Sequence, residues 1–285
     1  QIAGYESLSE IRATKKYVSE VNESIILLGR ELIKLNFNVI TTRAGFLLFK
    51  HKHFKVEKVI SKLKSENVFV RDVSKLGIHL EGYSRMNVGT LKQTRRLITI
   101  IKKLFSLKAI FLDRDGTILQ EPNGKSEADK VIGSFDELKI LPHTISGLRN
   151  LSNKGYTLFV VSNQDGINRG QISLDKYHEM NKIINETFAK AGIIIERWLV
   201  CPHLDEENCK CRKPKIGMFN SIIDKYYFDF SKSYMIGDRS SDVFFGKNLK
   251  LKTILVKRNE VEAWKTGSKP DYKVDNLEEA SEVIS

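Results

Sequence analysis

Short apolar runs alternate with helical stretches from Lys108 onward, and this alternation restricts the possible folds more than any other feature of the sequence. The runs are rich in β-branched and aromatic residues, which is typical of strands buried on both faces. Strands connected by crossover helices form a parallel sheet. We therefore predict an α/β fold, a Rossmann-like parallel sheet with helices on both faces. The predicted strands cover residues 109–113, 156–162, 193–200, 233–238 and 252–256, and the predicted helices lie near 143–154, 173–191, 216–226 and 241–248.

The first part of the chain has a different pattern. Apolar residues recur at helical spacing over residues 9–35, and shorter strand-like and helical segments follow. The strand-like segments include residues 68–73. This pattern predicts a small α+β domain. Because 285 residues fit about two domains of ordinary size, we divide the chain into residues 1–105 and 106–285.

The net charge of +12 is concentrated in this first part, where residues 1–107 hold 20 Lys and Arg against 9 Asp and Glu. Most of these basic residues fall at spacings expected for the solvated faces of helices, so we interpret them as surface charge. A nucleic-acid or partner-binding protein that docks through this part is the alternative from another class. Against that alternative, no aromatic platform is interleaved with the basic residues.

The sequence also bears on location. No apolar run reaches the roughly 20 residues that a membrane span needs, and the N-terminal residues show no secretory signal. We expect a cytoplasmic protein without membrane contact. Since the chain begins with Gln rather than Met, we expect a fragment, a processed product or a truncated fusion.

Two carboxylates follow the first predicted strand of the α/β part, at Asp113 and Asp115. Ligand-binding groups of parallel sheets collect at the carboxyl ends of the strands, and Ser162, Cys201 and Asp238 also stand at such ends. Neighbouring carboxylates repel each other unless a divalent cation offsets their charge. An acidic turn of ordinary kind is the alternative for these residues alone.

All three cysteines of the chain fall within one short segment, where they form the pattern C-x-H-x5-C-x-C. Three thiolates and one imidazole match a closed tetrahedral zinc site, in which no position is left for a substrate. We therefore predict structural Zn²⁺, and we expect it to fix the loop that delivers Arg212 and Lys213 to the strand ends. The predicted zinc ligands are Cys201, His203, Cys209 and Cys211.

Four separated motifs then occur in the order found in the haloacid dehalogenase superfamily, and on them the chain resembles that family. They are LDRDGT at 112–117, SNQ at 162–164, Lys213 in CRKP, and GDRSSD at 237–242. The resemblance implies a phosphatase in which Asp113 is the nucleophile, forming an aspartyl-phosphate, and Asp115 is the general acid and base.

The resemblance also implies the remaining parts of the site. Catalytic Mg²⁺ is expected on the Asp113 and Asp238 carboxylates and the Asp115 carbonyl. Asp242 is either an outer acid of this site or a helix N-terminal residue. The expected substrate is a small phosphorylated metabolite. The residues expected to bind its phosphate or the rest of the molecule are Thr117, Ser162, Asn163, Arg212, Lys213 and Glu121.

Within the superfamily, DRDGT, SNQDGI and CPH followed by CxCRKP look like the branch of histidinol-phosphate phosphatase and D-glycero-D-manno-heptose 1,7-bisphosphate phosphatase. The short spacing between His203 and Cys209, together with Glu121 and Pro122, is closer to the histidinol enzyme. Arg169 after the NQDG sequence is closer to the heptose enzyme, which remains the alternative. Histidinol phosphate carries an ammonium group, and Glu121 is our candidate partner for it, with a solvated loop glutamate as the alternative.

Residues 9–105 resemble the small C-terminal domain of pyridoxal-phosphate aminotransferases of the histidinol-phosphate type. The resemblance rests on GRELIKLNF, AGFLLF, NVFVRDV and YSRMNVGTLKQTRRLI. It implies that Arg85 grips an acidic group, although a structural arginine is the alternative. The cofactor-binding groups of that family lie in a large domain that this chain lacks, so pyridoxal phosphate is not expected. Self-association or pairing through this unit is a further expectation.

Overall fold

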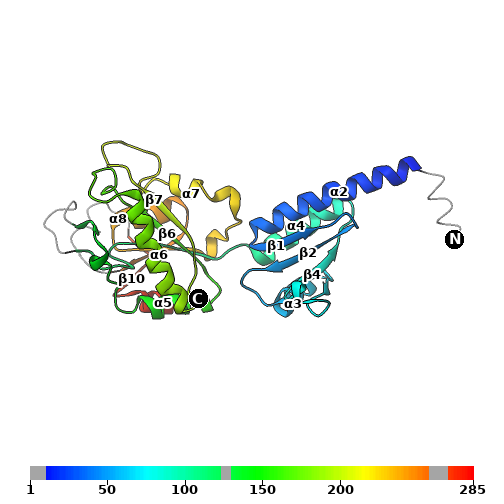
Figure 1. The fold of residues 1–285 in the computed structure, drawn as a ribbon, viewed down its shortest axis with the longest axis horizontal. Coiled ribbons are helices and arrows are strands. Elements are labelled where there is room, and N and C mark those ends of the chain that lie inside the picture. Colours follow the sequence, from blue (N-terminus) through cyan, green and yellow to red (C-terminus); the bar gives the residue numbers. More distant parts are fainter. Residues whose placement is uncertain (1–10, 123–129, 257–268) are drawn as a thin grey trace. The chain divides into compact units, whose positions relative to one another are not determined.

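The computed structural model describes residues 11–122, 130–256 and 269–285. The chain forms two compact units (Figure 1). The smaller unit holds Gln1–Ser106 together with Asp224–Tyr227, and the larger unit holds Leu107–Ile223 and Phe228–Ser285.

The smaller unit is an antiparallel sheet covered by helices. Its four strands lie in the order β1-β2-β4-β3. Its main elements are α2 (Ile11–Lys34), β1 (Phe37–Thr41), β2 (Phe46–His51), α3 (Val56–Lys64), β3 (Arg71–Asp72), β4 (Ser84–Asn87) and α4 (Leu91–Phe105).

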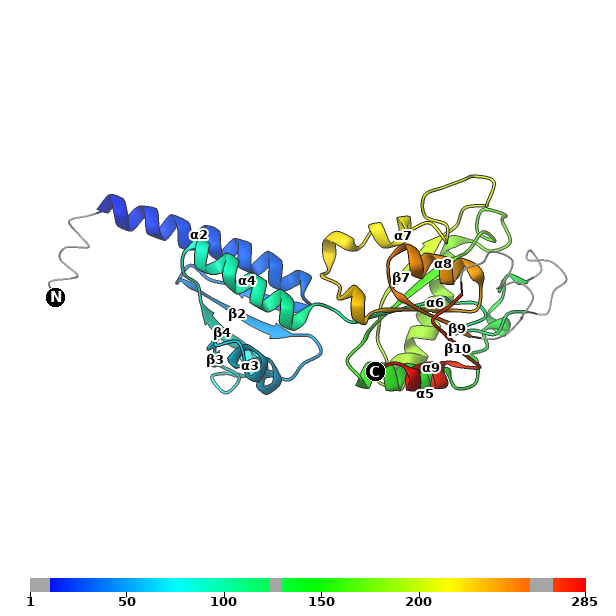
Figure 2. The same cartoon turned by 180° about the vertical axis from the view of Figure 1, so that it is seen from behind.

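Hydrophobic periodicity explains how this unit packs. The helix α2 buries Leu28 and Leu32 against β1 and α4, while β2 alternates between buried and half-buried positions along its length. Figure 2 shows α2 and α4 running side by side along the sheet. The predicted strand over 68–73 is mostly irregular, because β3 lies at a sheet edge and only two of its residues pair with β4.

His51 is a buried histidine at the end of β2 whose ring stacks on Phe54. Its Nδ1 accepts hydrogen bonds from the backbone N–H groups of His53 and Phe54, at 3.0 and 3.2 Å. Burial, reinforced by the positive charges of His53 and nearby lysines, lowers the pKa of His51 from 6.5 to about 3. The folded protein therefore holds this ring in its neutral form.

This histidine predicts a loss of stability in acid. Below pH 6.5 the unfolded chain binds a proton that the folded chain refuses, so the free energy of unfolding falls as the pH falls. About one pH unit below that value, the smaller unit should lose about 1.4 kcal/mol. Amide hydrogen exchange of the smaller unit at two pH values measures this loss. His51→Asn keeps an acceptor in place of Nδ1 without titrating, and it should remove most of the pH dependence; an unchanged dependence would exclude His51 as its source.

The larger unit is built on a parallel six-stranded sheet in the order β10-β9-β8-β5-β6-β7. The strands are β5 (Ala109–Leu112), β6 (Thr157–Asn163), β7 (Ile195–Cys201), β8 (Tyr234–Gly237), β9 (Lys252–Val256) and β10 (Tyr272–Val274). The helices are α5 (Thr144–Asn153), α6 (Leu174–Lys190), α7 (Gly217–Asn220), α8 (Ser240–Asn248) and α9 (Leu277–Val283).

The central strands β5, β6 and β8 of this sheet bury both of their faces. Ile110 and Leu112 of β5 face a core that contains the apolar residues of α5, α6 and α9. Phe111, between them, stacks on Phe159 and meets Phe219 of α7 edge-on. Helices therefore cover both faces of the sheet, which confirms the predicted fold class.

The strand order places a crevice beside β5. The chain passes from β5 to β6 on one side and returns to β8 on the other side, so the strand order reverses at β5. Ligands of open α/β sheets bind at such a reversal, outside the carboxyl ends of the strands. Asp113 directly follows β5 at this point.

Two details differ from the sequence prediction. The helix predicted over 216–226 is shorter, since α7 ends at Asn220 and a separate 3-10 turn, Ile223–Lys225, follows. Adjacent β-branched residues at Ile222 and Ile223 disfavour a continuous helix there. The elements β10 and α9 were not predicted.

Among the described residues, we find no helix with the length and hydrophobicity that a bilayer crossing requires.

Candidate functional site

Asp113 stands at the first residue beyond β5, and its backbone N–H donates to the Ile236 carbonyl of β8. The chain then turns at Gly116, where φ is +83°. A Cβ at this position would overlap with the Asp238 carboxylate. Glycine is required here both by the backbone conformation and by the close approach of Asp238. This turn brings the ends of β5 and β8 together.

Lys213 reaches the same point from the loop after β7. Its Nζ donates to Asp113 Oδ1 at 2.6 Å and to the Val161 carbonyl at 2.7 Å, and it lies 2.6 Å from Asp242 Oδ1. Burial would lower the pKa of Lys213, but the carboxylates of Asp113 and Asp242 outweigh burial and raise it. The lysine is therefore a buried ammonium ion.

Asp113, Asp238 and Asp242 form an acidic cluster, with carboxylate oxygens within 4.8 Å of one another. Burial raises the pKa of Asp238 well above its ordinary value, and the negative charges of Asp113 and Asp242 raise it further. Asp238 Oδ1 is shielded from solvent, and no described residue donates a hydrogen bond to it. Hard oxygen ligands with unbalanced negative charge suit a divalent cation such as Mg²⁺.

Asp115 lies beside this cluster, and both of its carboxylate oxygens are bonded. Arg114 Nη1 lies 2.7 Å from Oδ1, and Gln164 Nε2 donates to Oδ2. The same Gln164 amide donates to Ser162 Oγ at 2.8 Å. Because Ser162 Oγ accepts that bond, its own hydrogen is available to a ligand.

These groups line a cavity of about 320 Å³ at the carboxyl ends of the strands. Asp113, Asp115, Ser162, Asn163 and Lys213 form part of its wall. Its other charged lining residues are Glu121, Asp165 and Asp205, which are acidic, and Lys130, Arg212 and Arg239, which are basic.

The two arginines of this lining are paired with its three outer carboxylates. Arg239 contacts Glu121, and Arg212 lies 3.5 Å from both Asp165 and Asp205. Burial raises the pKa of Glu121, and the positive charge of Arg239 opposes that rise. The lining is therefore close to electrically balanced.

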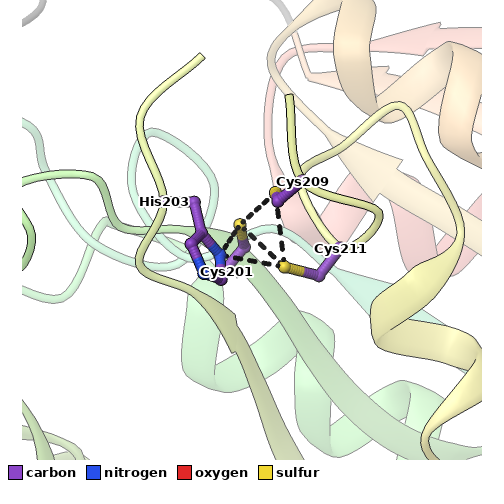
Figure 3. A group of neighbouring side chains, drawn as sticks. All are labelled: Cys201, His203, Cys209 and Cys211. Carbon is purple, nitrogen blue, oxygen red and sulfur yellow. Dashed lines mark hydrogen bonds between the residues drawn. The ribbon is translucent and has the colours of Figure 1, made fainter. Parts of the chain in front are cut away.

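The predicted zinc ligands converge after β7 (Figure 3). The sulfur atoms of Cys201 and Cys211 lie 3.2 Å apart, and His203 Nδ1 lies 3.2 Å from Cys211 and 3.6 Å from Cys201. Cys209 Sγ lies 3.4 Å from Cys211 Sγ. Zn–S bonds of about 2.3 Å in a tetrahedron require ligand atoms less than about 4 Å apart, so these side chains fit zinc.

This cluster is connected to the acidic site through two successive residues. Arg212 donates its backbone N–H to Cys209 Sγ and its guanidinium to the His203 carbonyl. Lys213 exchanges hydrogen bonds with the Asn163 side chain through its own N–H and carbonyl. The cluster therefore helps to set the position of Lys213.

Most residues named from the sequence meet at this site, with one exception. Thr117 is buried, is not among the cavity-lining residues, and its hydroxyl has no hydrogen-bond partner among the described residues. Asp242, for which the sequence left two roles open, lies in the first turn of α8 and also joins the acidic cluster. Sequence reasoning gave no role to Arg114, Gln164 or Arg239. All three lie within motifs that carried the family resemblance, LDRDGT, SNQ and GDRSSD, but the motifs alone did not show what these side chains contact.

The larger unit is a haloacid dehalogenase-like domain, as its parallel sheet, its strand-end acids and its sequence matches show together. A family model described as HAD-hydrolase-like matches residues 210–280. The histidine biosynthesis bifunctional protein HisB of Buchnera aphidicola subsp. Acyrthosiphon pisum is 37% identical over 152 residues, covering 53% of this chain and 41% of that protein. HisB of Actinobacillus pleuropneumoniae serotype 3 is 37% identical over 145 residues, covering 51% and 39%. The chain thus spans about two fifths of the length of these relatives.

A solved structure is also similar. D,D-heptose 1,7-bisphosphate phosphatase from B. bronchiseptica, complexed with magnesium and phosphate, superposes with a TM-score of 0.55 at 25% identity. The match covers 62% of this chain and 97% of that chain. A HAD-like phosphatase from Mesorhizobium loti, at 24% identity and a TM-score of 0.52, shares the fold.

Proposed function

We propose that the larger unit is a phosphatase that hydrolyses a small phosphate monoester through an aspartyl-phosphate on Asp113. The observation that carries this proposal is the position of the Asp113 carboxylate. It lies at a cavity wall, 2.6 Å from the Lys213 ammonium and next to both the acidic cluster and Asp115. A nucleophile, a proton-transferring group and a buried cation therefore meet at one strand end.

The reaction follows from these positions in two steps. A carboxylate oxygen of Asp113 attacks phosphorus while the bond between phosphorus and the ester oxygen breaks, and Asp115 donates a proton to the departing oxygen. Asp115 then removes a proton from a water molecule, which attacks phosphorus and releases inorganic phosphate from Asp113. The first step leaves a phosphorylated Asp113 and a deprotonated Asp115, and the second step returns both residues to their starting forms.

The surrounding groups stabilise charge on the transferring phosphoryl group. Lys213 supplies a positive charge beside the nucleophile, and the Ser162 hydroxyl and Asn163 lie on the same cavity wall as hydrogen-bonding groups. We propose that Arg212 contributes a further cation, after giving up its weak contacts with the carboxylates.

We propose Mg²⁺ as the catalytic cation and Zn²⁺ as the structural one. The Asp113 and Asp238 carboxylates and the Asp115 carbonyl would hold Mg²⁺, and Asp242 lies close enough to support them. When bound, magnesium supplies positive charge that offsets repulsion between the nucleophile and the phosphate. The cysteine cluster would hold zinc away from the reaction, with all four ligand positions filled by protein.

For the substrate, we propose histidinol phosphate, with heptose 1,7-bisphosphate as the second candidate. Glu121 and Asp165 suit a substrate ammonium group, and Arg239 and Arg212, with which they pair, suit a second phosphate, so the cavity lining favours neither candidate over the other. The likeness to histidine biosynthesis proteins supports this order, and the likeness to a heptose bisphosphate phosphatase supports the second candidate.

We expect kcat/KM for histidinol phosphate to exceed that for the heptose bisphosphate by at least about tenfold, which corresponds to about 1.4 kcal/mol in transition-state binding. Phosphate release from each substrate, with magnesium present, measures the ratio. A ratio reversed in favour of the bisphosphate would select the second candidate. If Glu121→Gln leaves KM for histidinol phosphate unchanged, Glu121 does not bind the ammonium group and serves only to pair with Arg239.

The smaller unit is proposed to be an aminotransferase-like small domain, on its sequence motifs alone. Transamination and dephosphorylation are successive steps toward histidinol, which gives a reason for the two units to share a chain. Docking of nucleic acid through the basic residues of this unit is the remaining alternative. A steep loss of DNA binding with rising salt would support that alternative.

A further inference from the structure

Arg114 has the largest side chain that the described part of the chain buries almost completely, with 1% of its surface exposed. It lies in sequence between the two aspartates of the proposed reaction, but it is not among the residues that line the cavity. Its Nη1 lies 2.7 Å from Asp115 Oδ1. No described residue accepts a hydrogen bond from its Nε or Nη2.

A guanidinium in this position is costly for the fold. Removing a guanidinium from water is unfavourable unless its N–H groups find acceptors. One carboxylate can accept hydrogen bonds from only some of these N–H groups. The ring of Tyr177 packs against the arginine, with its centroid 5.0 Å from the guanidinium carbon. Tyr177 comes from α6 and is itself buried. An apolar side chain of similar volume would fill this space at a lower cost in desolvation free energy. Packing alone therefore does not explain an arginine here, and we attribute it to its contact with one carboxylate.

That group is Asp115, and the opposite side of its carboxylate is held as well. Gln164 donates to Oδ2 and also to Ser162 Oγ, so its amide plane is fixed at two points. The carboxylate therefore sits between a guanidinium behind the cavity wall and an amide within it. Rotation of the Asp115 side chain would break both bonds.

We propose that Arg114 is a positioning residue: together with Gln164 it holds Asp115 in the orientation from which it protonates the departing oxygen. This inference rests on the proposed function, and it concerns the proton transfer alone. A general acid matters most when the leaving group is a poor one, such as an alkoxide. A nitrophenolate leaves without a proton, so it reports on nucleophilic attack by Asp113 without this assistance.

The test compares two substrates in the full-length protein, histidinol phosphate as an alkyl ester and p-nitrophenyl phosphate as an aryl ester. For Arg114→Met, kcat/KM should fall about 100-fold with the alkyl ester and less than about fivefold with the aryl ester. Asp115→Asn should show the same selective loss. The double variant should lose little more activity than either single variant, because both substitutions remove the same function, proton transfer to the leaving group. Arg114→Lys keeps the positive charge but not the planar guanidinium, so it should lose less activity than Arg114→Met.

Tyr177→Phe is the matched control, because it keeps the ring under the guanidinium and removes only a hydroxyl that makes no hydrogen bond of normal geometry. It should leave the ratio between the two substrates unchanged. If Arg114→Met does not fold, Gln164→Leu removes the other side chain that holds the Asp115 carboxylate. It should reduce kcat/KM for the alkyl ester much more than for the aryl ester.

The outcomes separate this inference from the proposed function. An equal loss with both esters would make Arg114 a structural residue, and an unchanged rate with the alkyl ester in a folded variant would also overturn its positioning role. By contrast, p-nitrophenyl phosphate hydrolysis that survives in Asp113→Asn would overturn the proposed function itself.

Discussion

Asp113→Asn is expected to reduce phosphate release by at least about 10⁴-fold, the scale on which enzymes lose activity when their nucleophile is removed. The amide has nearly the shape of the carboxylate but cannot form the acyl phosphate. The fold should survive, since Lys213 keeps its contacts with Val161 and Asp242. Stability should change little, because the loss of one of the mutually repelling charges near Asp238 is offset by the loss of an ion pair with the buried Lys213.

The measurement combines phosphate release with thermal unfolding of both proteins. Asp175→Asn is the matched control: it makes the same chemical change at an exposed position in the first turn of α6, and it should leave activity intact. Acid-quenched enzyme should carry labelled phosphate on the peptide that contains Asp113 in the wild type alone. Activity within tenfold of wild type in the Asn variant would exclude Asp113 as the nucleophile.

The fold of the larger unit was predictable because its strands are continuous apolar runs. Runs such as residues 252–256 have the same bounds in the structure as in the sequence prediction. The position of Asp113 followed from the same pattern, since the residue after a buried parallel strand must lie at the sheet edge. The apolar runs do not predict the order of the strands in the sheet, because that order depends on the side of β5 to which each crossover connection leads.

Pairings between distant residues were the part that a single sequence could not supply. Glu121 was interpreted as a substrate contact because it lies near the nucleophile, but in the structure it pairs with Arg239 of the β8–α8 turn. Arg114 lies within the LDRDGT motif, but the sequence did not predict its role, because packing against α6 decides whether a side chain beside a strand end points outward or into the core. By contrast, the convergence of three cysteines and one histidine after β7 could be predicted, because these four residues lie close together in the sequence.

Cys211→Ser is expected to remove bound zinc and to reduce phosphate release on the order of 10³-fold, the scale for losing preorganised donors around a reacting group. Cys211 Sγ has the shortest contacts in the cluster, with Cys201 and with His203. Without zinc, the two remaining thiols, the serine hydroxyl and the imidazole no longer hold the loop together, and the bonds that join it to Arg212 weaken. Lys213 would then lose its fixed position beside Asp113.

Metal analysis, thermal unfolding and phosphate release are measured together on this variant. Lys210→Ala is the control, because it changes an exposed residue between two ligands while keeping the backbone carbonyl that accepts from Gly217. Wild-type protein treated with a chelator distinguishes the roles of the two metals. Adding magnesium alone should leave phosphate release impaired, and adding zinc with magnesium should restore it. Full activity of zinc-free Cys211→Ser in magnesium would show that the loop positions Lys213 without metal, through the Asn163 hydrogen bonds alone.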